Sequence, residues 1–442
     1  MAEDQNIEWK TNWNDEYLKW ICGFANANGG KLYIGKDNKG EITGLRNIHK
    51  LLQDLPNKIR DVLGILVDVN LLCEDGKEYL EINVEPYPSP ISYKGRYYYR
   101  SGSTLQELKG IALEKFLLKK QGQRWDNVLL FNASVSDLNQ HTIDFFKNRA
   151  LKSNRIDDYI LSESADILLE NLQLLEKGKP KRAAILLFHS NPEKIIPGAF
   201  VKIGFFKTDE DIIFQDEIHG NLFEQVEKTM EILFSKYIKA IISYEGIHRI
   251  ENYEYPKDAV REALLNALAH KDYSGAAPVQ ISVYDEKILF WNEGQLPENW
   301  TVEMLKQKHP SKPFNPLIAN AFFRSGYIEA WGRGTLKMMT LCKEAGLPEP
   351  EYRYDAGGYW VVFRKDIYTE QYLKNLGLNE RQIKAVMYVK RNGKITNKVY
   401  QQINNISKRT ATNELKSLVD DYKLFNRTGK HGAGIAYVLI GQ

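Results

Sequence analysis

The pattern of apolar and polar residues around position 270 predicts one helix followed by two strands. Glu262, Asn266 and His270 are four residues apart, and the positions between them are mostly Ala and Leu. A helix therefore places the three polar side chains on one face, while Ala and Leu favour the helix and pack on the opposite face. From 278 to 290 apolar residues alternate with more polar ones, which predicts two strands joined at 285–287.

Turn residues and alternation predict further elements in the first half of the chain. The cluster Asn28-Gly29-Gly30 ends a helix and turns the chain into a strand at 31–35, and 37–40 is a hairpin turn. The region 121–255 has no residue pattern that indicates chemistry. We expect its helices at 142–151, 164–175 and 221–242, and its strands at 183–188 and 200–206.

Residues 371–442 have the pattern of three helices followed by a hairpin. Asn379, Thr396 and Ser407 stand where an N-cap is expected at each helix start. Two short stretches, 424–427 and 436–440, then make a hairpin around a glycine-rich turn. This order predicts a winged helix-turn-helix, whose third helix would enter the major groove of DNA.

Positive charge is concentrated in the same segment. It holds 13 Lys and Arg residues against four acidic ones, a net charge of +9, whereas the whole chain carries +3. This concentration indicates a polyanion partner such as DNA; a winged helix used for protein contact is the alternative. The expected DNA contacts are Lys408, Arg409, Thr410, Thr412 and Asn413 on the third helix, and Arg427, Lys430 and His431 on the wing.

The overall composition is ordinary for a folded protein. With 442 residues, 43% hydrophobic and 26% charged, the chain has room for three or four domains. We find no basic-apolar leader and no apolar run near about 18 residues, so we expect no secretion, no membrane span and a cytoplasmic location. Cys22, Cys73 and Cys342 lie far apart without a CxxC pair, and we expect them to be reduced core thiols.

Glu262 and Asn266 combine a carboxylate and a carboxamide one helical turn apart. One Asn oxygen together with nucleotide phosphates would suffice for Mg²⁺, which prefers oxygen ligands and keeps several waters. Such spacing is also common on solvated helix faces, so it does not decide the function alone. Glycine-rich turns follow at 291–294 and 331–335, and a turn of this kind at the start of a helix attracts phosphate.

In this ordered series the chain resembles the GHKL (Bergerat-fold) ATPases, in the divergent branch found in bacterial transcriptional regulators. The matching residues are Glu262-xxx-Asn266-Ala267-xx-His270, Asn292-Glu293-Gly294-Gln295-Leu296-Pro297, Asn315-Pro316-Leu317-Ile318-Ala319, Ile328-Glu329-xx-Gly332-Arg333-Gly334 and Gly346-Leu347-Pro348-Glu349-Pro350. The resemblance implies that Glu262 polarises the attacking water and that 295–331 is a lid. The residues it implies for ATP and Mg²⁺ are Asn266, which binds the metal, His270, Asn292, Gly294 at the adenine, and Gly332, Arg333, Gly334 and Thr335 at the phosphates.

One position departs from the wider ATPase family. Typical members hold the adenine amino group with an Asp before the first glycine, where this chain has Asn292 or Glu293. Because Asn accepts a hydrogen bond through its carbonyl, binding stays compatible with the sequence, but the lost charge bears on affinity and turnover. The domain would then be a weak ATPase, a switch that binds without cycling, or an inactive remnant.

The N-terminus resembles the AlbA_2, or Schlafen-like, domain through Ile7-Glu8-Trp9-Lys10 and the stretch 21–35, over about residues 1–120. Members are often described as nucleic-acid binders, and in nuclease-active relatives a group of acids binds the metal. The candidates here are Glu3, Glu8 and Asp37. Alternatively, Glu8 pairs with Lys10 or Lys31 and Asp37 caps its turn. The segment 94–103, rich in Tyr and cations, either tracks a nucleic-acid backbone or is an ordinary strand.

We therefore expect a mixed α/β (α+β) multidomain protein. Its parts would be an AlbA_2 domain at 1–120, an α/β connector at 121–255, a Bergerat-type α/β sandwich at 256–368 and a winged helix at 371–442. The expected function is a DNA-binding, ATP-responsive regulator that acts as a homo-oligomer, most simply a dimer, without a membrane partner. The alternatives are a metal-dependent nuclease with nucleotide sensing, in defence against foreign nucleic acid, and a scaffold that only binds DNA.

Overall fold

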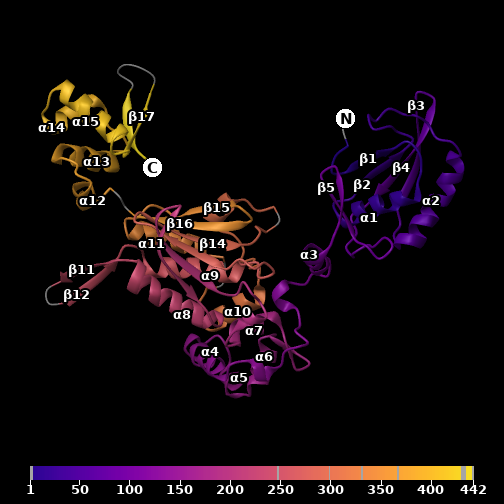
Figure 1. Ribbon diagram of the computed structural model, residues 1–442, viewed down its shortest axis with the longest axis horizontal. Helices are drawn as coiled ribbons and strands as arrows, with labels where there is room; N and C mark the ends of the chain where they lie inside the picture. The colour runs from indigo at the N-terminus through magenta and orange to yellow at the C-terminus, as the bar shows by residue number, and fades with distance from the viewer. Residues whose placement is uncertain are drawn as a thin grey trace. The chain divides into compact units, whose positions relative to one another are not determined.

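The computed structural model describes residues 3–245, 248–297, 299–329, 332–365, 368–429 and 435–440 (Figure 1). The chain forms two compact units, and its architecture is mixed α+β, as the sequence predicts. The first unit consists of Met1–Ser190 and Phe314–Ser325, and the second of Asn191–Pro313 and Gly326–Gln442. Among the described residues, no helix is both long and apolar enough to cross a membrane.

A four-stranded sheet and two helices form the N-terminal part of the first unit. They are β1 (Ile7–Lys10), α1 (Leu18–Asn26), β2 (Gly30–Ile34), α2 (Ile48–Leu63), β3 (Asp68–Glu74) and β4 (Lys77–Val84). The strand order is β1-β2-β4-β3, with β1 and β2 parallel and the other neighbours antiparallel. Alternating residues such as Leu32 and Ile82 form one core with Phe24 of α1 and Ile59 of α2. The predicted strand after Asn28-Gly29-Gly30 is confirmed.

A hairpin and a group of helices complete the first unit. They are β5 (Tyr98–Ser101), β6 (Thr104–Glu107), α3 (Gly110–Lys120), α4 (Gln140–Ser153), α5 (Asp158–Ser162), α6 (Ala165–Asn171), β7 (Leu175–Glu176), β8 (Lys179–Pro180), α7 (Arg182–Phe188) and α10 (Pro316–Arg324), with 3-10 turns at Asp15–Tyr17, Trp125–Asn127 and Val135–Asp137. The helix α10 comes from much later in the chain. The buried Asp126 holds its start, because Oδ2 accepts hydrogen bonds from the backbone N–H groups of Leu317 at 2.7 Å and Ile318 at 3.3 Å.

A six-stranded sheet is the centre of the second unit. Its strands are β9 (Val201–Thr208), β10 (Asp211–Ile218), β13 (Val279–Val283), β14 (Lys287–Glu293), β15 (Glu351–Asp355) and β16 (Gly358–Arg364), in the order β10-β9-β13-β14-β16-β15. Only β9 and β13 are parallel. The sheet therefore includes two strands from the region 121–255. The strand pair around 285–287 is confirmed as β13 and β14.

Helices cover one face of this sheet. They are α8 (Leu222–Ile232), α9 (Lys257–His270) and α11 (Gly334–Glu344), with a π-helical turn at Leu233–Tyr237 and 3-10 turns at Pro192–Lys194 and Val302–Lys306. The helix α9 packs against β14 and contacts both α8 and α11 (Figure 1). Buried residues such as Ile281, Phe290 and Phe363 lie on the strand positions that face it. A separate two-stranded hairpin joins β11 (Ala240–Glu245) to β12 (His248–Tyr253).

Four helices and a hairpin make up the end of the chain, around a core of their own. They are α12 (Glu370–Asn375), α13 (Glu380–Asn392), α14 (Asn397–Asn404), α15 (Lys408–Asp420), β17 (Phe425–Thr428) and β18 (Ala436–Leu439). The predicted N-caps are confirmed: the side chains of Asn379, Thr396 and Ser407 accept hydrogen bonds from the third backbone N–H that follows each of them. The antiparallel pair β17 and β18 is the predicted hairpin.

Three expectations about local structure are wrong. The run 183–188 is helix α7 and not a strand, because a short apolar run is equally suited to a buried helix. The helix expected at 221–242 ends its α-helical part at Ile232, and the β-branched stretch near 241 is strand β11. Cys73 is exposed, since β3 is the edge strand of its sheet, whereas Cys22 and Cys342 are buried as expected.

Candidate functional site

The helix α9 places Glu262 and Asn266 side by side. The Nδ2 atom of Asn266 donates a long hydrogen bond of 3.4 Å to Oε1 of Glu262. Glu262 is 9% exposed, while Asn266 is half-buried. The two residues are therefore neighbours on one helix face, as their spacing predicts.

Gly334 brings the start of α11 against this pair. A Cβ atom at Gly334 would overlap Oε1 of Glu262 and would lie 3.2 Å from Nδ2 of Asn266, so a side chain there would displace the Glu262 carboxylate from its present position. The preceding Arg333 is the N-cap residue, and its side chain makes no capping hydrogen bond. The first N–H groups of a helix carry partial positive charge and attract anions. Carboxylate, carboxamide and helix N-terminus thus meet at one point.

The charges around Glu262 affect its proton affinity. Burial raises the pKa of its carboxyl group, and the charges of Lys337 and Arg261 and the hydrogen bond from Asn266 partly oppose this rise. A carboxylate with a raised pKa is a better proton acceptor near neutral pH. Lys337 lies one helical turn after Gly334 and was not among the predicted site residues. Its spacing within the helix that follows the glycines is the sequence signal that would have found it.

His270, Gly294 and Asn292 lie close to one another at the C-terminal end of α9. A Cβ at Gly294 would lie 3.0 Å from the carbonyl oxygen of His270 and 3.3 Å from Nδ2 of Asn292. Burial, and to a smaller extent the charge of His309, lower the pKa of His270 to about 4, so its ring is neutral at pH 7.

Asn292, not Glu293, lies on the helix-covered face of the sheet. Asn292 is 5% exposed and alternates with the buried Ile288 and Phe290, and its Nδ2 donates to the carbonyl of Glu293 at 3.1 Å. The carboxylate of Glu293 instead lies where a Cβ on Gly275 would meet it. Of the two residues at the usual Asp position, Asn292 is therefore the one that shares a face with Glu262.

The segment between Gln295 and 329 reaches the start of α11 through His309. Its Nε2 atom lies 3.2 Å from Oγ1 of Thr335, and a Cβ on Gly332, whose φ is +62°, would overlap the carbonyl oxygen of His309. Sequence reasoning did not single out His309, because nothing local marks a histidine in a long loop.

Each of the three acids proposed as metal ligands in the N-terminal domain is engaged by other residues. Glu8, 2% exposed, pairs with Lys10 and with Nη1 of the fully buried Arg100 at 2.8 Å. Burial raises the pKa of Glu8, and Lys10 and Arg100 oppose this rise. Oδ1 of Asp37 accepts from the N–H groups of Lys39 and Glu41, both at 2.9 Å.

Glu3 also has a structural contact. Its Oε1 accepts from the backbone N–H of Trp9 at 3.1 Å and lies 3.8 Å from Nζ of Lys10. Lys31 pairs with Glu81 and not with Glu8. Within the described part of the chain, no three His, Cys, Asp or Glu side chains are grouped so that they could hold a metal ion.

The helix α15 exposes most of the residues predicted to contact DNA. Lys408, Arg409, Thr412 and Asn413 are exposed, whereas Thr410 is half-buried and its hydroxyl is 3.0 Å from that of Ser407. Lys416 is exposed one turn after Thr412 and extends the same face, as its spacing of eight from Lys408 would have indicated. Arg427 is exposed on β17, and Lys430 and His431 lie outside the described residues.

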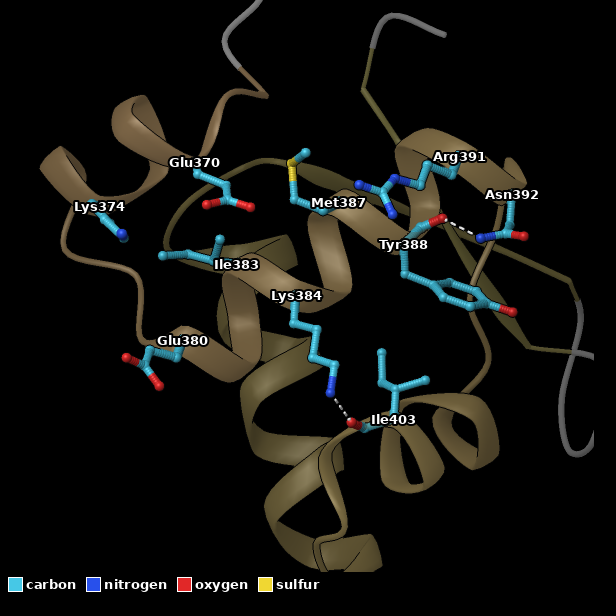
Figure 2. A pocket seen from close by; sticks show the side chains of 10 residues that line it. All are labelled: Glu370, Lys374, Glu380, Ile383, Lys384, Met387, Tyr388, Arg391, Asn392 and Ile403. Atoms are coloured by element: carbon cyan, nitrogen blue, oxygen red, sulfur yellow. Dashed lines mark hydrogen bonds between the residues drawn. The ribbon is translucent and has the colours of Figure 1, made fainter.

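A shallow cavity of about 460 Å³ lies on the C-terminal helices (Figure 2). In Figure 2, Met387, Tyr388 and Lys384 of α13 line it together with Ile403 at the end of α14, and Nζ of Lys384 donates to the carbonyl of Ile403 at 2.6 Å. None of the predicted site residues lines this cavity.

Comparison with protein families identifies two parts of the chain. Residues 3–109 match the family model described as "Schlafen, AlbA_2", and residues 276–363 match HATPase_c_4, described as "Putative ATP-dependent DNA helicase recG C-terminal". The chain carries a Schlafen AlbA_2 domain and a HATPase_c_4 domain. The second match includes Asn292, Gly294 and Gly332–Thr335 but begins beyond His270. Glu262 and Asn266 therefore lie outside the matched range, but they contact Gly334, which lies inside it.

Two solved structures are similar to parts or all of the chain. The DIP2311 protein from Corynebacterium diphtheriae is 18% identical with a TM-score of 0.46, over 98% of this chain and 92% of that chain. The N-terminal domain of a "Putative ATP-dependent DNA Helicase RecG-related Protein" from Nitrosomonas europaea is 25% identical with a TM-score of 0.19, over 25% of this chain and 87% of that chain. No curated protein matches the chain.

Proposed function

We propose that this protein is a DNA-binding regulator whose HATPase_c_4 domain binds ATP with Mg²⁺. The observation that carries the nucleotide half is the contact of Gly334 with Glu262 and Asn266. It joins a buried carboxylate and an amide to the start of α11, where a phosphate chain would find backbone N–H donors that the N-cap side chain does not occupy. The description of the matched family names an ATP-dependent protein, which supports the same ligand.

The donor set is suited to a nucleotide-bound magnesium ion. Asn266 and Glu262 offer hard oxygen donors next to the phosphate end, and one protein oxygen with phosphate oxygens is a usual arrangement for Mg²⁺. When bound, the ion would neutralise phosphate charge and orient the terminal phosphate. Glu262 is the group that would orient and deprotonate water, and its raised pKa favours this role. Asn292 in place of Asp supports slow turnover.

A rearrangement of the lid would also move residues that do not contact the nucleotide. The lid at 295–331 begins and ends in the second unit, but its helix α10 belongs to the first. Besides the hydrogen bonds to Asp126, Nη1 of Arg155 donates to the carbonyl of Phe323 at 2.9 Å, and Oγ of Ser153 donates to that of Arg324 at 2.6 Å. We propose that nucleotide-dependent ordering of the lid acts through α10 and changes how two protomers present their C-terminal segments to DNA.

The C-terminal segment would bind DNA as a winged helix. Three capped helices followed by an antiparallel hairpin, with Lys408, Arg409 and Lys416 exposed on the third helix, support this proposal. The rival reading as a metal-dependent nuclease has no comparable support, because Glu8 and Asp37 are engaged by Arg100, Lys10 and turn N–H groups.

Calorimetry with ATP-γ-S and Mg²⁺ tests the nucleotide half. Wild type should bind with a Kd of roughly micromolar order, and Asn266→Ala should weaken binding about tenfold or more. Gln280→Ala is the control, because it removes an exposed amide from β13, a strand of the sheet that α9 covers. Absence of binding by wild type would refute the proposal.

DNA titrations at several salt concentrations test the other half. Removing Lys408 and Arg409 by Ala substitutions should lower the slope of log K against log salt by about 2, since each phosphate contact contributes about 0.9. Lys374→Ala with Lys384→Ala removes the same charge from α12 and α13 and should leave the slope nearly unchanged. The regulatory link requires that ATP-γ-S and Mg²⁺ change DNA affinity in wild type but not in Asn266→Ala.

A further inference from the structure

His309 is the lid residue that lies at the start of α11. Its Nε2 is 3.2 Å from the hydroxyl of Thr335, the second residue of that helix, and its Nδ1 donates to the carbonyl of Pro310 at 3.1 Å. The Nδ1 contact fixes the ring so that Nε2 faces the helix start.

The surroundings hold this ring in place. Gly332, just before the helix, allows its backbone to approach His309, since a Cβ there would overlap the histidine carbonyl and lie 3.1 Å from Nδ1. On the lid side, the ring of Trp300 packs edge to face at 5.0 Å between centroids, and Nζ of Lys312 lies 5.6 Å from the Trp300 ring centroid. The imidazole is therefore positioned from both sides at the turn that opens α11.

The position of His309 relative to Glu262 indicates which phosphate it would meet. Glu262 contacts Gly334, and His309 contacts the next residue, Thr335. If Glu262 activates water for attack, the terminal phosphate lies nearest to it. Backbone N–H groups of the helix start would bind any phosphate, and a lid side chain next to the Glu262 contact would add a contact to the terminal phosphate.

We propose that His309 is the residue by which this protein distinguishes a nucleoside triphosphate from a diphosphate. Nε2 donates to an oxygen of the terminal phosphate, and this contact holds the lid on the triphosphate. A diphosphate leaves the contact unmade. The inference rests on the proposed function, because it assumes that the helix start binds the phosphates.

The test compares affinities for ATP-γ-S and ADP, both with Mg²⁺, by calorimetry on the full chain. His309→Ala should weaken ATP-γ-S binding roughly 10- to 100-fold, the worth of a hydrogen bond to a charged group, and change ADP binding less than about threefold. His309→Gln keeps an N–H donor and should recover part of the loss. Gln307→Ala, an exposed position in the same segment, should change neither affinity.

The outcomes separate the two proposals. An equal loss for both nucleotides, or no loss in His309→Ala, would overturn the role of His309 and leave the nucleotide site standing. Failure of wild type to bind either nucleotide would overturn both. If His309→Ala unfolds, the ratio of the two affinities in His309→Gln still decides, because a lost fold would not change one nucleotide selectively.

Discussion

Glu8 and Glu262 are both buried carboxylates that the sequence marks as candidate functional residues, Glu8 as a metal ligand and Glu262 as the group that activates water. Glu8 lies in a cluster with Lys10, Arg100 and Glu3, and the guanidinium of Arg100 also lies 4.7 Å from the ring of Trp20. Glu262 has an amide and a glycine as its nearest partners. The first carboxylate is neutralised by cations of its own domain, whereas the second has no comparable ion pair in the described structure and lies beside an uncapped helix start.

This difference teaches how partners decide the role of a buried acid. Arg100 donates to the carbonyls of Asp4 at 2.7 Å and Ile7 at 3.1 Å as well as pairing with Glu8, so it ties the first strand to β5. A paired, buried carboxylate stabilises one arrangement of the chain. A buried carboxylate beside N–H donors and an amide is better placed to act on a ligand.

The largest expected effect is on turnover at the Glu262 cluster. Glu262→Gln keeps the shape and the contact with Asn266 but removes the proton acceptor, so ATP hydrolysis should fall about 100- to 10,000-fold. ATP affinity should change less than about threefold, because the phosphate donors are kept. Single-turnover hydrolysis and calorimetry measure both. Unchanged hydrolysis would mean that Glu262 has only a structural role, like Glu8.

The next effect is on stability at the Glu8 cluster. Glu8→Gln leaves Arg100 buried without its charged partner, which should cost about 3–5 kcal/mol. Hydrogen exchange of the full chain should show this loss in the amides of β1 and β2, while ATP binding is unchanged. A variant with wild-type protection that has lost a metal-dependent cleavage activity would reverse the assignment and make Glu8 catalytic.

The pH dependence of stability gives a further test, at His270 on the helix that carries Glu262. Its pKa is lowered from 6.5 to about 4, so the unfolded chain takes up a proton at higher pH than the folded one. The stability from neutral His270 is therefore complete above about pH 6.5 and is lost as pH falls toward 4, by about 1–3 kcal/mol. Exchange of the α9 amides at several pH values measures this loss.

Two histidine variants control the titration. His270→Gln should flatten the pH dependence of the α9 amides, because glutamine has no proton to take up in this range. His141→Gln changes an exposed histidine and should leave it as in wild type. An equal slope in His270→Gln and wild type would show that another group causes the acid sensitivity.

The smallest expected effect is at Asp37. Asp37→Ala removes two hydrogen bonds to turn N–H groups that are exposed to water, which should cost about 1 kcal/mol or less. Thermal unfolding of the full chain measures it. A much larger loss, or a loss of nucleic-acid cleavage, would return Asp37 to the group of candidate metal ligands.

The sequence predictions were correct where the signal lies within a few neighbouring residues, and they failed where the structure depends on residues far apart in the chain. The helix α9, the pair β13 and β14 and the capped helices α13 to α15 were predicted correctly, because periodicity and caps are local. The helix α7 was taken for a strand, since a fully apolar run has no periodicity to distinguish the two. No local pattern in the sequence predicts that β9 and β10 pair in one sheet with the strands that follow α9.

By itself, the sequence determined that Glu262 and Asn266 are neighbours, because every α-helix, whatever surrounds it, places residues four apart on one face. It also determined where positive charge accumulates, since that is a matter of composition. Only the tertiary structure decided that Gly334 closes on this pair, that His309 comes from the lid to Thr335 and that Arg100 neutralises Glu8. These contacts join residues distant in the chain, and their existence depends on strand order and packing, which no local pattern encodes.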